Sequence, residues 1–230
     1  MKRIKYNTLL SAGILLIAIL LMAGTSSAAS ILTNTTLDNG TTETYANVVG
    51  YQSNQSQGGY ITEIDITQRN TQTQNWQGFF GNITGNIYLK GSGGQSMFNW
   101  TVNLTNTFVY ATTNATGNNY TSLQNATPSI LDTVWGFGSI TDNINRTYLA
   151  SSDDPTFVGI PLTDTYNATT AAGFLDYVIQ DVSGTPAMSN TLWAAKIYED
   201  KDNFKGTTSD FELLVPVSAT PEIYYFYIEI

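Results

Sequence analysis

The side chains that could carry chemistry in this chain are mainly carboxylates, because the sequence contains neither histidine nor cysteine. Their absence excludes a Ser-His-Asp triad, a Cys-His pair and the usual structural zinc sites. The eighteen Asp and Glu residues leave room for a hydrolase with two convergent carboxylates, but no spacing singles out a pair. An aspartic protease would need Asp-Thr-Gly, whereas residues 132–134 read Asp-Thr-Val and residues 164–166 read Asp-Thr-Tyr. The composition therefore favours a protein that is not an enzyme.

A second group of oxygen-bearing side chains could bind calcium, which prefers carboxylate and amide ligands. Residues 199–203 read Glu-Asp-Lys-Asp-Asn and place Asp200, Asp202 and Asn203 in one loop. The loop departs from the EF-hand pattern because an aromatic residue follows where another oxygen ligand belongs. Residues 153–155, Asp-Asp-Pro, form a second candidate. Both segments are also typical of solvated turns, which is the simpler interpretation.

The strongest chemical signal is a set of Asn-x-Ser/Thr sequons, which are acceptors for N-linked glycans. They occur about twice as often as the composition alone predicts. None follows residue 167, so either another subunit covers the last part of the chain or its strands lie in the core. The eleven acceptors are Asn34, Asn39, Asn54, Asn82, Asn99, Asn103, Asn114, Asn119, Asn125, Asn145 and Asn167.

The N-terminus has the three-part layout of a secretory signal. Lys2, Arg3 and Lys5 give a positive region, residues 9–23 form an apolar run, and small residues at 26–29 offer a cleavage site. The run is shorter than the ~20 residues that a spanning helix needs. Residues 1–29 are therefore predicted to be a signal peptide that is removed, with an uncleaved anchor as the alternative. Either outcome places the rest of the chain outside the cell, and the mature chain is predicted to have no membrane span.

The charge of the mature chain limits its partners. Removing residues 1–29 leaves six cations against eighteen anions, a net charge of −12, which excludes a nucleic-acid-binding surface. Only 12% of residues are charged, against a usual ~25%, so neutral amides and hydroxyls must supply the surface polarity. Without disulfides, stability must come from core size, bound ions, glycans or assembly.

The pattern of short β-branched and aromatic runs, separated by Gly, Asn, Ser and Pro, predicts an all-β fold. We expect residues 30–44 to be a Thr/Asn-rich arm and residues 45–230 to be a single antiparallel β-sandwich, Ig-like or jelly-roll-like. The strands are expected at 45–51, 60–67, 79–89, 97–104, 107–112, 174–181, 192–199, 211–217 and 224–230, with a short helix at 129–135 and an exposed loop at 113–127.

Strand periodicity links the fold to the sequons. Successive side chains of a strand point to opposite faces, so Phe98 and Trp100 fall on one face while Asn99 and Asn103 fall on the other. Residues 81–89 repeat this alternation, and the Gly-rich turn at 90–95 joins the two segments as a hairpin. The acceptors are thus expected to face solvent, with the apolar side facing a dry interior.

The C-terminal strand is unusually apolar. Phe226, Ile228 and Ile230 are expected to face a core, with Tyr225, Tyr227 and Glu229 on the opposite side. A strand of this kind must pair within its own domain or insert into a neighbour by strand addition. The candidate assembly strand comprises Tyr224, Tyr225, Phe226, Tyr227, Ile228 and Ile230.

Two segments have distinctive motifs. The first is residues 75–87, Asn-Trp-Gln-Gly-Phe-Phe-Gly-Asn-Ile-Thr-Gly-Asn-Ile, with Met-Phe-Asn-Trp at 97–100. The second begins at Gly206 and continues with Asp-Phe-Glu-Leu-Leu-Val-Pro at 210–216 and Tyr-Tyr-Phe-Tyr-Ile-Glu at 224–229. Both segments resemble parts of uncharacterised secreted proteins of archaea, and this resemblance implies an archaeal cell-surface protein and transfers no catalytic residue. Considered on their own, four aromatic residues are expected to lie in the core of a hairpin: Trp76, Phe79, Phe80 and Trp100.

These observations predict a self-associating structural glycoprotein, a subunit of an archaeal cell envelope or surface filament that forms a homo-oligomer or polymer. The alternative is an adhesin module that binds glycans or surfaces, in which Trp135, Trp193 and several tyrosines stack on sugars. A carboxylate-dependent extracellular hydrolase is the third interpretation.

Overall fold

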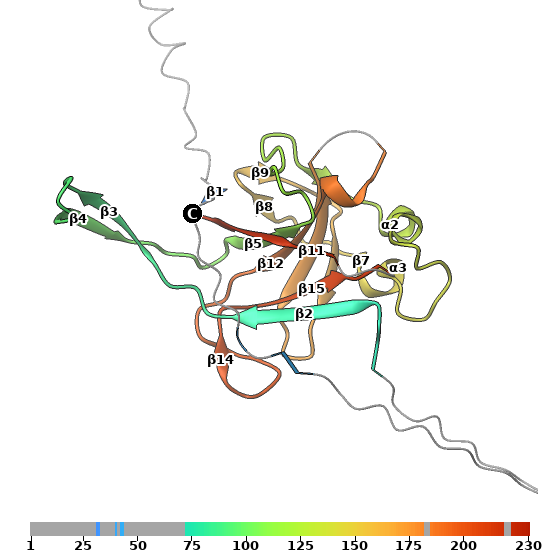
Figure 1. Cartoon of the computed structure of the whole chain (residues 1–230). Coiled ribbons are helices and arrows are strands. Elements are labelled where there is room, and N and C mark those ends of the chain that lie inside the picture. Colours follow the sequence, from blue (N-terminus) through green and yellow to red (C-terminus); the bar gives the residue numbers. More distant parts are fainter. Residues whose placement is uncertain (1–30, 33–39, 41, 44–71, 182–184, 219–221) are drawn as a thin grey trace, which may run out of the picture.

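The computed structural model of the chain describes residues 31–32, 40, 42–43, 72–181, 185–218 and 222–230. This part is mostly β, with antiparallel strands and few short helices, as predicted (Figure 1). The predicted signal peptide and the strands expected at 45–51 and 60–67 lie outside the described residues, as does most of the arm at 30–44. No helix in these described ranges has the length and apolar character needed to cross a bilayer.

An antiparallel sheet of eight strands organises the body. The strand order is β1-β16-β5-β12-β11-β10-β7, and β6 also pairs with β11. The central pairs are long and regular, with Val178 opposite Trp193 and Tyr110 opposite Ala194. The strands are β1 (Ile31–Leu32), β5 (Phe108–Thr112), β6 (Gln124–Asn125), β7 (Leu149–Ala150), β10 (Tyr166–Thr169), β11 (Leu175–Gln180), β12 (Thr191–Lys196) and β16 (Tyr225–Glu229).

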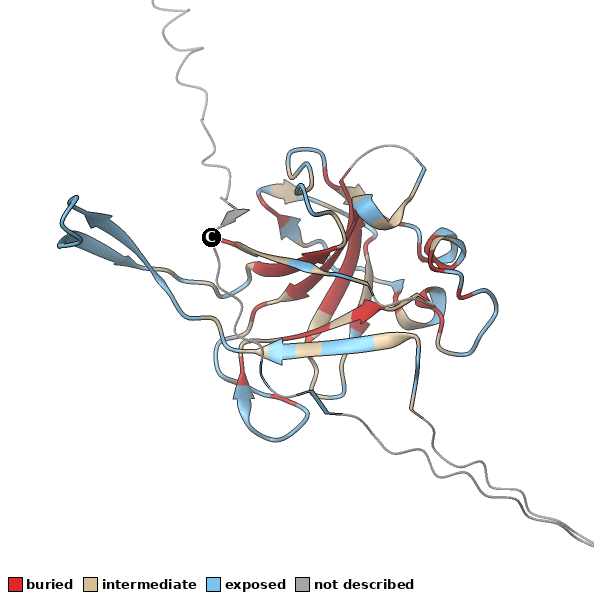
Figure 2. Cartoon of the chain, in the orientation of Figure 1, coloured by how far each residue is buried: buried red, intermediate tan, exposed pale blue. Residues whose placement is uncertain are grey.

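Both faces of this sheet are covered, and the alternation along each central strand assigns its side chains to two clusters (Figure 2). On β12, Trp193 and Ala195 join the first cluster, whereas Leu192 and Ala194 join the second. On β11, Val178 belongs to the first cluster. Because apolar side chains of the central strands are buried on both faces, the sheet forms the centre of the molecule.

The first face is covered by a strand pair and two helices. Strands β2 (Trp76–Gly81) and β15 (Phe211–Pro216) form an antiparallel pair. The helices are α2 (Pro128–Trp135), which confirms the helix expected at 129–135, and α3 (Ile144–Thr147). Helix α2 begins at a proline, a residue suited to a first turn, and ends at Gly136 in the left-handed region. The rings of Trp76, Trp135 and Tyr148 lie 6.2, 5.5 and 5.2 Å from that of Trp193.

The second face is covered by loops and a short hairpin of β8 (Thr156–Phe157) and β9 (Ile160–Pro161). The Phe157 ring, fully buried, lies 4.5 Å from that of Phe108. The loop at 113–127 was expected to be exposed, but Leu123 and Ala126 are buried. The expectation holds for residues such as Thr116 and Asn119, which are exposed, but not for these two, which pack into the core. The remaining short elements are the 3-10 helix η1 (Met188–Asn190), β13 (Lys201–Asp202) and β14 (Thr208–Ser209).

The C-terminal strand β16 pairs within its own chain. It lies beside β5, with Tyr225 opposite Thr112 and Ile228 opposite Val109, so it is not a free strand. Its alternation is as expected, since Phe226 packs against the first cluster. Glu229 lies on the opposite side, as expected, but it is only 4% exposed, because the second face of the sheet is also covered.

Candidate functional site

The most unusual surface of the molecule is a hairpin of β3 (Asn86–Lys90) and β4 (Ser96–Thr101) that projects from the body (Figure 1). Its turn is closed by a 2.9 Å hydrogen bond from the Gly91 N–H to the Gln95 carbonyl, and Gly94 takes a positive φ of 82°. The segment 79–89 was expected to be one strand, but residues 82–85 are not in a strand. Asp210 stabilises this irregular segment, because its Oδ2 accepts a 2.6 Å hydrogen bond from the Ile83 N–H.

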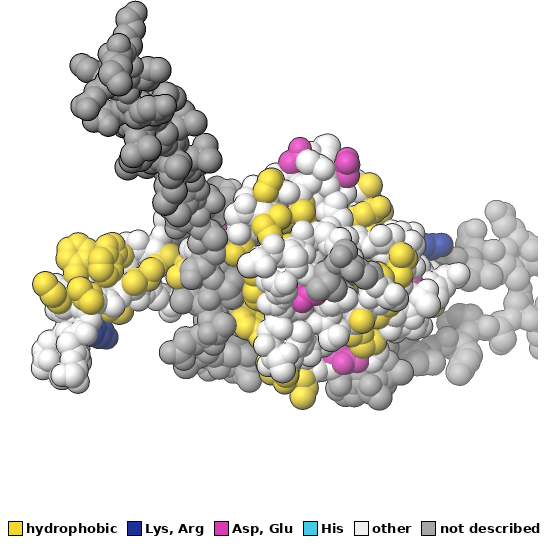
Figure 3. Space-filling view, turned by 90° about the horizontal axis from the view of Figure 1, so that it is seen from above, with side chains coloured by type: hydrophobic (Ala, Val, Ile, Leu, Met, Phe, Trp, Pro, Cys, Tyr) yellow, Lys and Arg dark blue, Asp and Glu magenta, His cyan; other side chains and the backbone are white. Residues whose placement is uncertain are grey.

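One face of the hairpin is apolar and exposed. Ile87 lies opposite Trp100, and Leu89 lies opposite Phe98, so these four side chains share a face. Their exposed fractions are 43% for Ile87, 47% for Trp100, 50% for Leu89 and 56% for Phe98. The rings of Phe98 and Trp100 lie 4.8 Å apart. Figure 3 shows hydrophobic side chains gathered on the projecting hairpin. The prediction that this face is dry was wrong, because the hairpin extends beyond the body.

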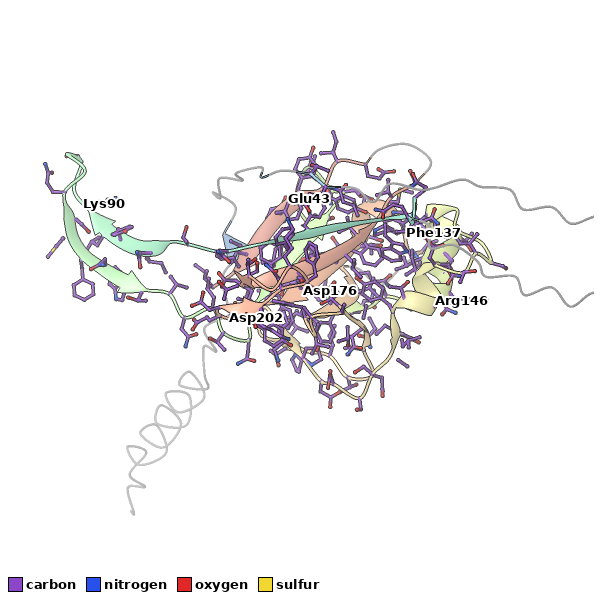
Figure 4. The ribbon with its side chains drawn as sticks, turned by 90° about the horizontal axis from the view of Figure 1, so that it is seen from below. Glu43, Lys90, Phe137, Arg146, Asp176 and Asp202 are labelled. Atoms are coloured by element: carbon purple, nitrogen blue, oxygen red, sulfur yellow. The ribbon has the colours of Figure 1, made fainter. Side chains whose placement is uncertain are left out.

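The opposite face is mixed, because it carries the exposed ring of Tyr88 beside polar side chains that include the sequon asparagine Asn99. Tyr88 lies opposite Asn99, and its hydroxyl accepts a 3.2 Å hydrogen bond from the Asn86 side chain. The ammonium group of Lys90 lies 4.3 Å from the centre of the Tyr88 ring. Figure 4 shows Lys90 on the hairpin, far from Asp176 in the body. Because Asn99 lies on the face opposite the four apolar side chains, a glycan on Asn99 would leave the apolar face uncovered.

An isolated two-stranded hairpin is only marginally stable in water, so an apolar face on one indicates a contact with something else. The aromatic side chains alone can each bury about 150–250 Å². With about half of each apolar side chain exposed, the face offers an area on the order of a few hundred Å², which in a monomer often marks an interaction site. The other predicted core aromatics differ: Trp76 and Phe79 pack against the first cluster, while Phe80 is 40% exposed against Phe204.

The hairpin also differs from the body in charge. No Asp or Glu occurs from residue 66 to residue 131, and the hairpin carries one cation, Lys90. All fourteen carboxylate side chains from residue 72 onward follow residue 131. The hairpin thus belongs to a part of the surface without negative charge, which an acidic body repels little.

The sequons lie at the surface, but not all are equally open. Of the eleven, Asn34, Asn39 and Asn54 lie outside the described residues. None of the other eight is buried, which agrees with the predicted outward orientation. The exposed acceptors are Asn82, Asn99, Asn103, Asn119 and Asn145, and the half-buried ones are Asn114, Asn125 and Asn167.

The calcium candidate at Asp200, Asp202 and Asn203 has the geometry of a closed turn. The Asn203 side chain, 5% exposed, accepts from the Lys205 N–H at 2.9 Å and donates to the Ser209 hydroxyl at 2.8 Å. Its oxygen is therefore already engaged within the loop. In the parts of the chain that the structure describes, no three Asp, Glu, His or Cys side chains gather as a metal site.

The second calcium candidate, at residues 153–155, engages one carboxylate oxygen internally. Oδ2 of Asp153 accepts a 3.1 Å hydrogen bond from the Asn167 side chain. Asp153 and Asp154 are both exposed. Calcium binding stays a prediction, and the geometry favours the interpretation of both segments as solvated turns.

The two tryptophans expected to stack on sugars cannot do so. Trp193 is fully buried and Trp135 is 3% exposed, so both lie in the first cluster. That part of the adhesin interpretation was wrong, because each indole is packed between the main sheet and the strands and helices that cover its first face. The exposed Trp100 is the residue that could serve such a role, and its position in an apolar alternation had pointed to the core instead.

Buried carboxyl groups occur without a cation beside them. Asp176 on β11 is fully buried, and its Oδ2 accepts a 2.8 Å hydrogen bond from the Leu214 N–H on β15. Burial raises the pKa of Asp176 well above its usual value, an effect that the Leu214 bond reduces and nearby Glu212 increases. Because Asp176 has no exposed surface, a substrate cannot reach it, so this group is structural.

Comparisons of the chain with protein-family models, curated proteins and solved structures gave no match.

Proposed function

We propose that this chain is an exported, N-glycosylated structural subunit of an archaeal cell envelope or surface filament, which associates with further copies through the apolar face of the β3–β4 hairpin. The exposure of Ile87, Leu89, Phe98 and Trp100 on a projecting hairpin is the observation that carries the proposal. Export and the archaeal source rest on the signal-like N-terminus and on the resemblance of two segments to archaeal secreted proteins.

The partner proposed for the hairpin is the opposite end of another copy. At the end of the body away from the hairpin, around α2, α3 and β7, three apolar side chains are exposed: Ile130, Ile140 and Leu149. The acid-free hairpin complements the acidic body of a neighbour, whereas two bodies repel each other. A contact between different surfaces of identical subunits repeats without closing unless the rotation forms a ring, and so builds a filament.

We propose the hairpin as the surface of association in place of the C-terminal strand, which was expected to associate by strand addition. Strand β16 is already paired with β5 on one side, and β1 pairs with part of its other side. We also propose that the complete domain is a β-sandwich. The support is that β2 and β15 lie across one face of the main sheet, with Leu213 and Val215 in the first cluster.

Size measurements on purified mature chain test the proposal. The wild-type chain should form concentration-dependent assemblies in analytical ultracentrifugation and in electron micrographs. Replacing Phe98 and Trp100 by Thr should abolish them, because it removes the aromatic half of the apolar face. The matched control is Tyr88→Thr, which removes an aromatic ring from the opposite face and should assemble normally.

A mixing experiment distinguishes a head-to-tail contact from a symmetric one. A variant with Ser at positions 130, 140 and 149 keeps its hairpin but loses the receiving surface, and it should be monomeric alone. Mixed with the Phe98/Trp100 variant, it should form dimers that cannot grow. A wild-type chain that stays monomeric at high concentration, with and without calcium, would contradict the proposal.

An adhesin is the second candidate, and the exposed Phe98 and Trp100 rings favour it. Flat aromatic surfaces of this kind can stack on sugars as well as on protein. Glycan-array binding that is lost in the Phe98/Trp100 variant, by a chain that does not assemble, would favour the adhesin over the structural subunit.

A further inference from the structure

We propose that the described sequons divide into two functional classes. Asn125 and Asn167 stay unmodified and act as structural hydrogen-bond donors, while the exposed acceptors carry the glycans: Asn82, Asn99, Asn103, Asn119 and Asn145. The second half of this statement rests on the proposed function, because it requires export past a glycosyl transferase. The first half rests on the folded geometry alone.

The chemistry of N-glycosylation explains why side-chain geometry matters. The Asn Nδ2 forms a bond to C1 of a sugar that is activated as a lipid-linked phosphate, and the bond from C1 to the phosphate oxygen breaks. The phosphate leaves with the electron pair, and one amide proton passes to a base of the transferase. The modified nitrogen keeps a single N–H. An asparagine that uses both N–H groups in the fold must therefore lose one of those bonds when it is modified.

Asn125 uses its amide to join two distant segments. Its Nδ2 donates to the carbonyl oxygens of Thr163 at 2.6 Å and Asp164 at 3.2 Å, across 38 and 39 residues of sequence. Its Oδ1 is buried, so the side chain cannot turn outward without withdrawing this atom from the interior. Asn125 also lies in β6, paired with Ile179 of β11. A sugar on Nδ2 would lie between β6 and the loop that it holds.

Asn167 is held in the same way within the sheet. Its Nδ2 donates to the Ser151 hydroxyl at 2.9 Å and to Oδ2 of Asp153 at 3.1 Å. Its backbone lies in β10, between two other strands, opposite Tyr177 on β11 and Leu149 on β7. A strand paired on both sides cannot bend to present its acceptor.

The exposed acceptors have the opposite geometry. At Asn119, Oδ1 accepts from the Thr121 N–H at 3.1 Å and from the Thr121 hydroxyl at 2.7 Å, which forms an Asx turn across the sequon. At Asn103, Oδ1 accepts from the Thr105 N–H at 2.9 Å. In both cases the oxygen is engaged, and no hydrogen bond between described residues uses Nδ2. Asn114 lies between the classes, since its Nδ2 makes one bond, at 2.8 Å to the Gly117 carbonyl, and could keep it after modification.

Glycopeptide mass spectrometry of the native secreted chain tests the division. We expect sugar on the five exposed acceptors and unmodified peptide at Asn125 and Asn167. Substantial occupancy at Asn125 or Asn167 in folded protein would overturn the structural class. A native chain without any glycan would instead overturn the glycoprotein part of the proposed function and the acceptor class with it.

Stability measurements in a host without glycosylation test the structural class separately. Asn125→Gln should lower the midpoint of thermal unfolding by about 2–4 °C or more, because a displaced amide leaves two carbonyls without their donor. The matched control is Thr127→Ala, which destroys the same sequon and leaves Asn125 in place. The Thr127 side chain makes no capping hydrogen bond to α2, so this control should change little. Asn167→Gln and Thr169→Ala form a second pair with the same expected contrast. Equal effects within each pair would refute a structural role for these asparagines.

Discussion

The Tyr110 hydroxyl donates a 2.7 Å hydrogen bond to Oε2 of Glu229, joining β5 to the C-terminal strand inside the second cluster. The other carboxyl oxygen, Oε1, accepts from the Val158 N–H at 2.9 Å. Both oxygens are thus satisfied by neutral donors. Among the described residues the ion pair between Lys205 and Glu43 is exposed, so it neutralises none of the buried acids. Burial raises the pKa of Glu229, and these two hydrogen bonds partly offset the shift.

Removing the Tyr110 hydroxyl should destabilise the fold. In Tyr110→Phe, Oε2 of Glu229 loses its donor while it stays buried, which costs about 1–3 kcal/mol of unfolding free energy. Chemical denaturation near pH 6 measures this difference. The control is Tyr225→Phe on the same strand as Glu229, where the side chain is 36% exposed and the loss should be within about 0.5 kcal/mol. Equal effects of the two substitutions would show that the Glu229 bond contributes nothing.

The buried acids should make the molecule more stable in acid than at neutral pH. Burial raises the pKa of Asp176, Asp132 and Glu229 in the folded state, whereas hydrogen bonds led by that from Thr73 lower the pKa of Asp142. Above about pH 4 the unfolded chain releases protons that the folded chain still holds at the first three groups. The unfolding free energy therefore falls as the pH rises from about 4 towards the raised folded-state pKa values.

Asp176→Asn isolates this effect, because an amide oxygen can still accept from the Leu214 N–H. The unfolding free energy of the variant should match that of the wild type near pH 4 and exceed it at pH 7. Its thermal midpoint should therefore vary less with pH. Asp154→Asn makes the same change in charge at an exposed site and should keep the wild-type slope. A wild-type midpoint that rises steadily from pH 4 to pH 7 would contradict the prediction.

The pattern of apolar residues predicted most of the longer described strands and which side chains share a face. It missed short strands such as β7 and β10, and it did not report what covers each face. Phe98 and Tyr110 both lie in strands that were predicted from short apolar runs, yet Phe98 is 56% exposed and Tyr110 is fully buried. The difference depends on contacts between distant parts of the chain, which local periodicity does not report. The burial of Glu229 was not foreseen for the same reason, since its partner Tyr110 lies 119 residues away.

The sequons show the same limit. The Asn-x-Thr pattern is the same at Asn119 and Asn125, and strand alternation foresaw the exposure only of acceptors such as Asn99 and Asn103. What separates the two is a pair of carbonyls at 163 and 164, brought to Asn125 by the fold. No signal within the tripeptide distinguishes the asparagine that we propose to be structural from the one that we propose to carry a glycan.

The loop around Asn203 should depend on the asparagine and not on calcium. Asn203→Ala removes a buried amide that bonds to Lys205, Thr207 and Ser209, and it should cost about 1–3 kcal/mol of unfolding free energy. Adding calcium or a chelator should leave the thermal midpoint of the wild type unchanged. A midpoint that rises with calcium concentration would instead establish a bound ion, because a ligand that prefers the folded state stabilises it by mass action.

Trp193 and Trp100 should respond in opposite ways to the loss of their rings. Trp193 is fully buried against Trp76, Trp135 and Tyr148, so Trp193→Ala should cost about 3–5 kcal/mol of unfolding free energy. Trp193→Phe should cost much less, because it keeps most of the ring volume and removes an indole N–H that has no hydrogen-bond partner in the described structure.

Trp100→Ala should change the unfolding free energy of the monomer by less than about 0.5 kcal/mol, because the ring is 47% exposed on a hairpin that projects from the body. Its effect should appear only in the association of copies, as a shift in the sedimentation profile at high concentration. If denaturation of dilute monomer showed a loss comparable to that of Trp193→Ala, the hairpin would have to fold back onto its own body in solution. The apolar face would then be covered internally, and no surface would remain there for a neighbouring copy.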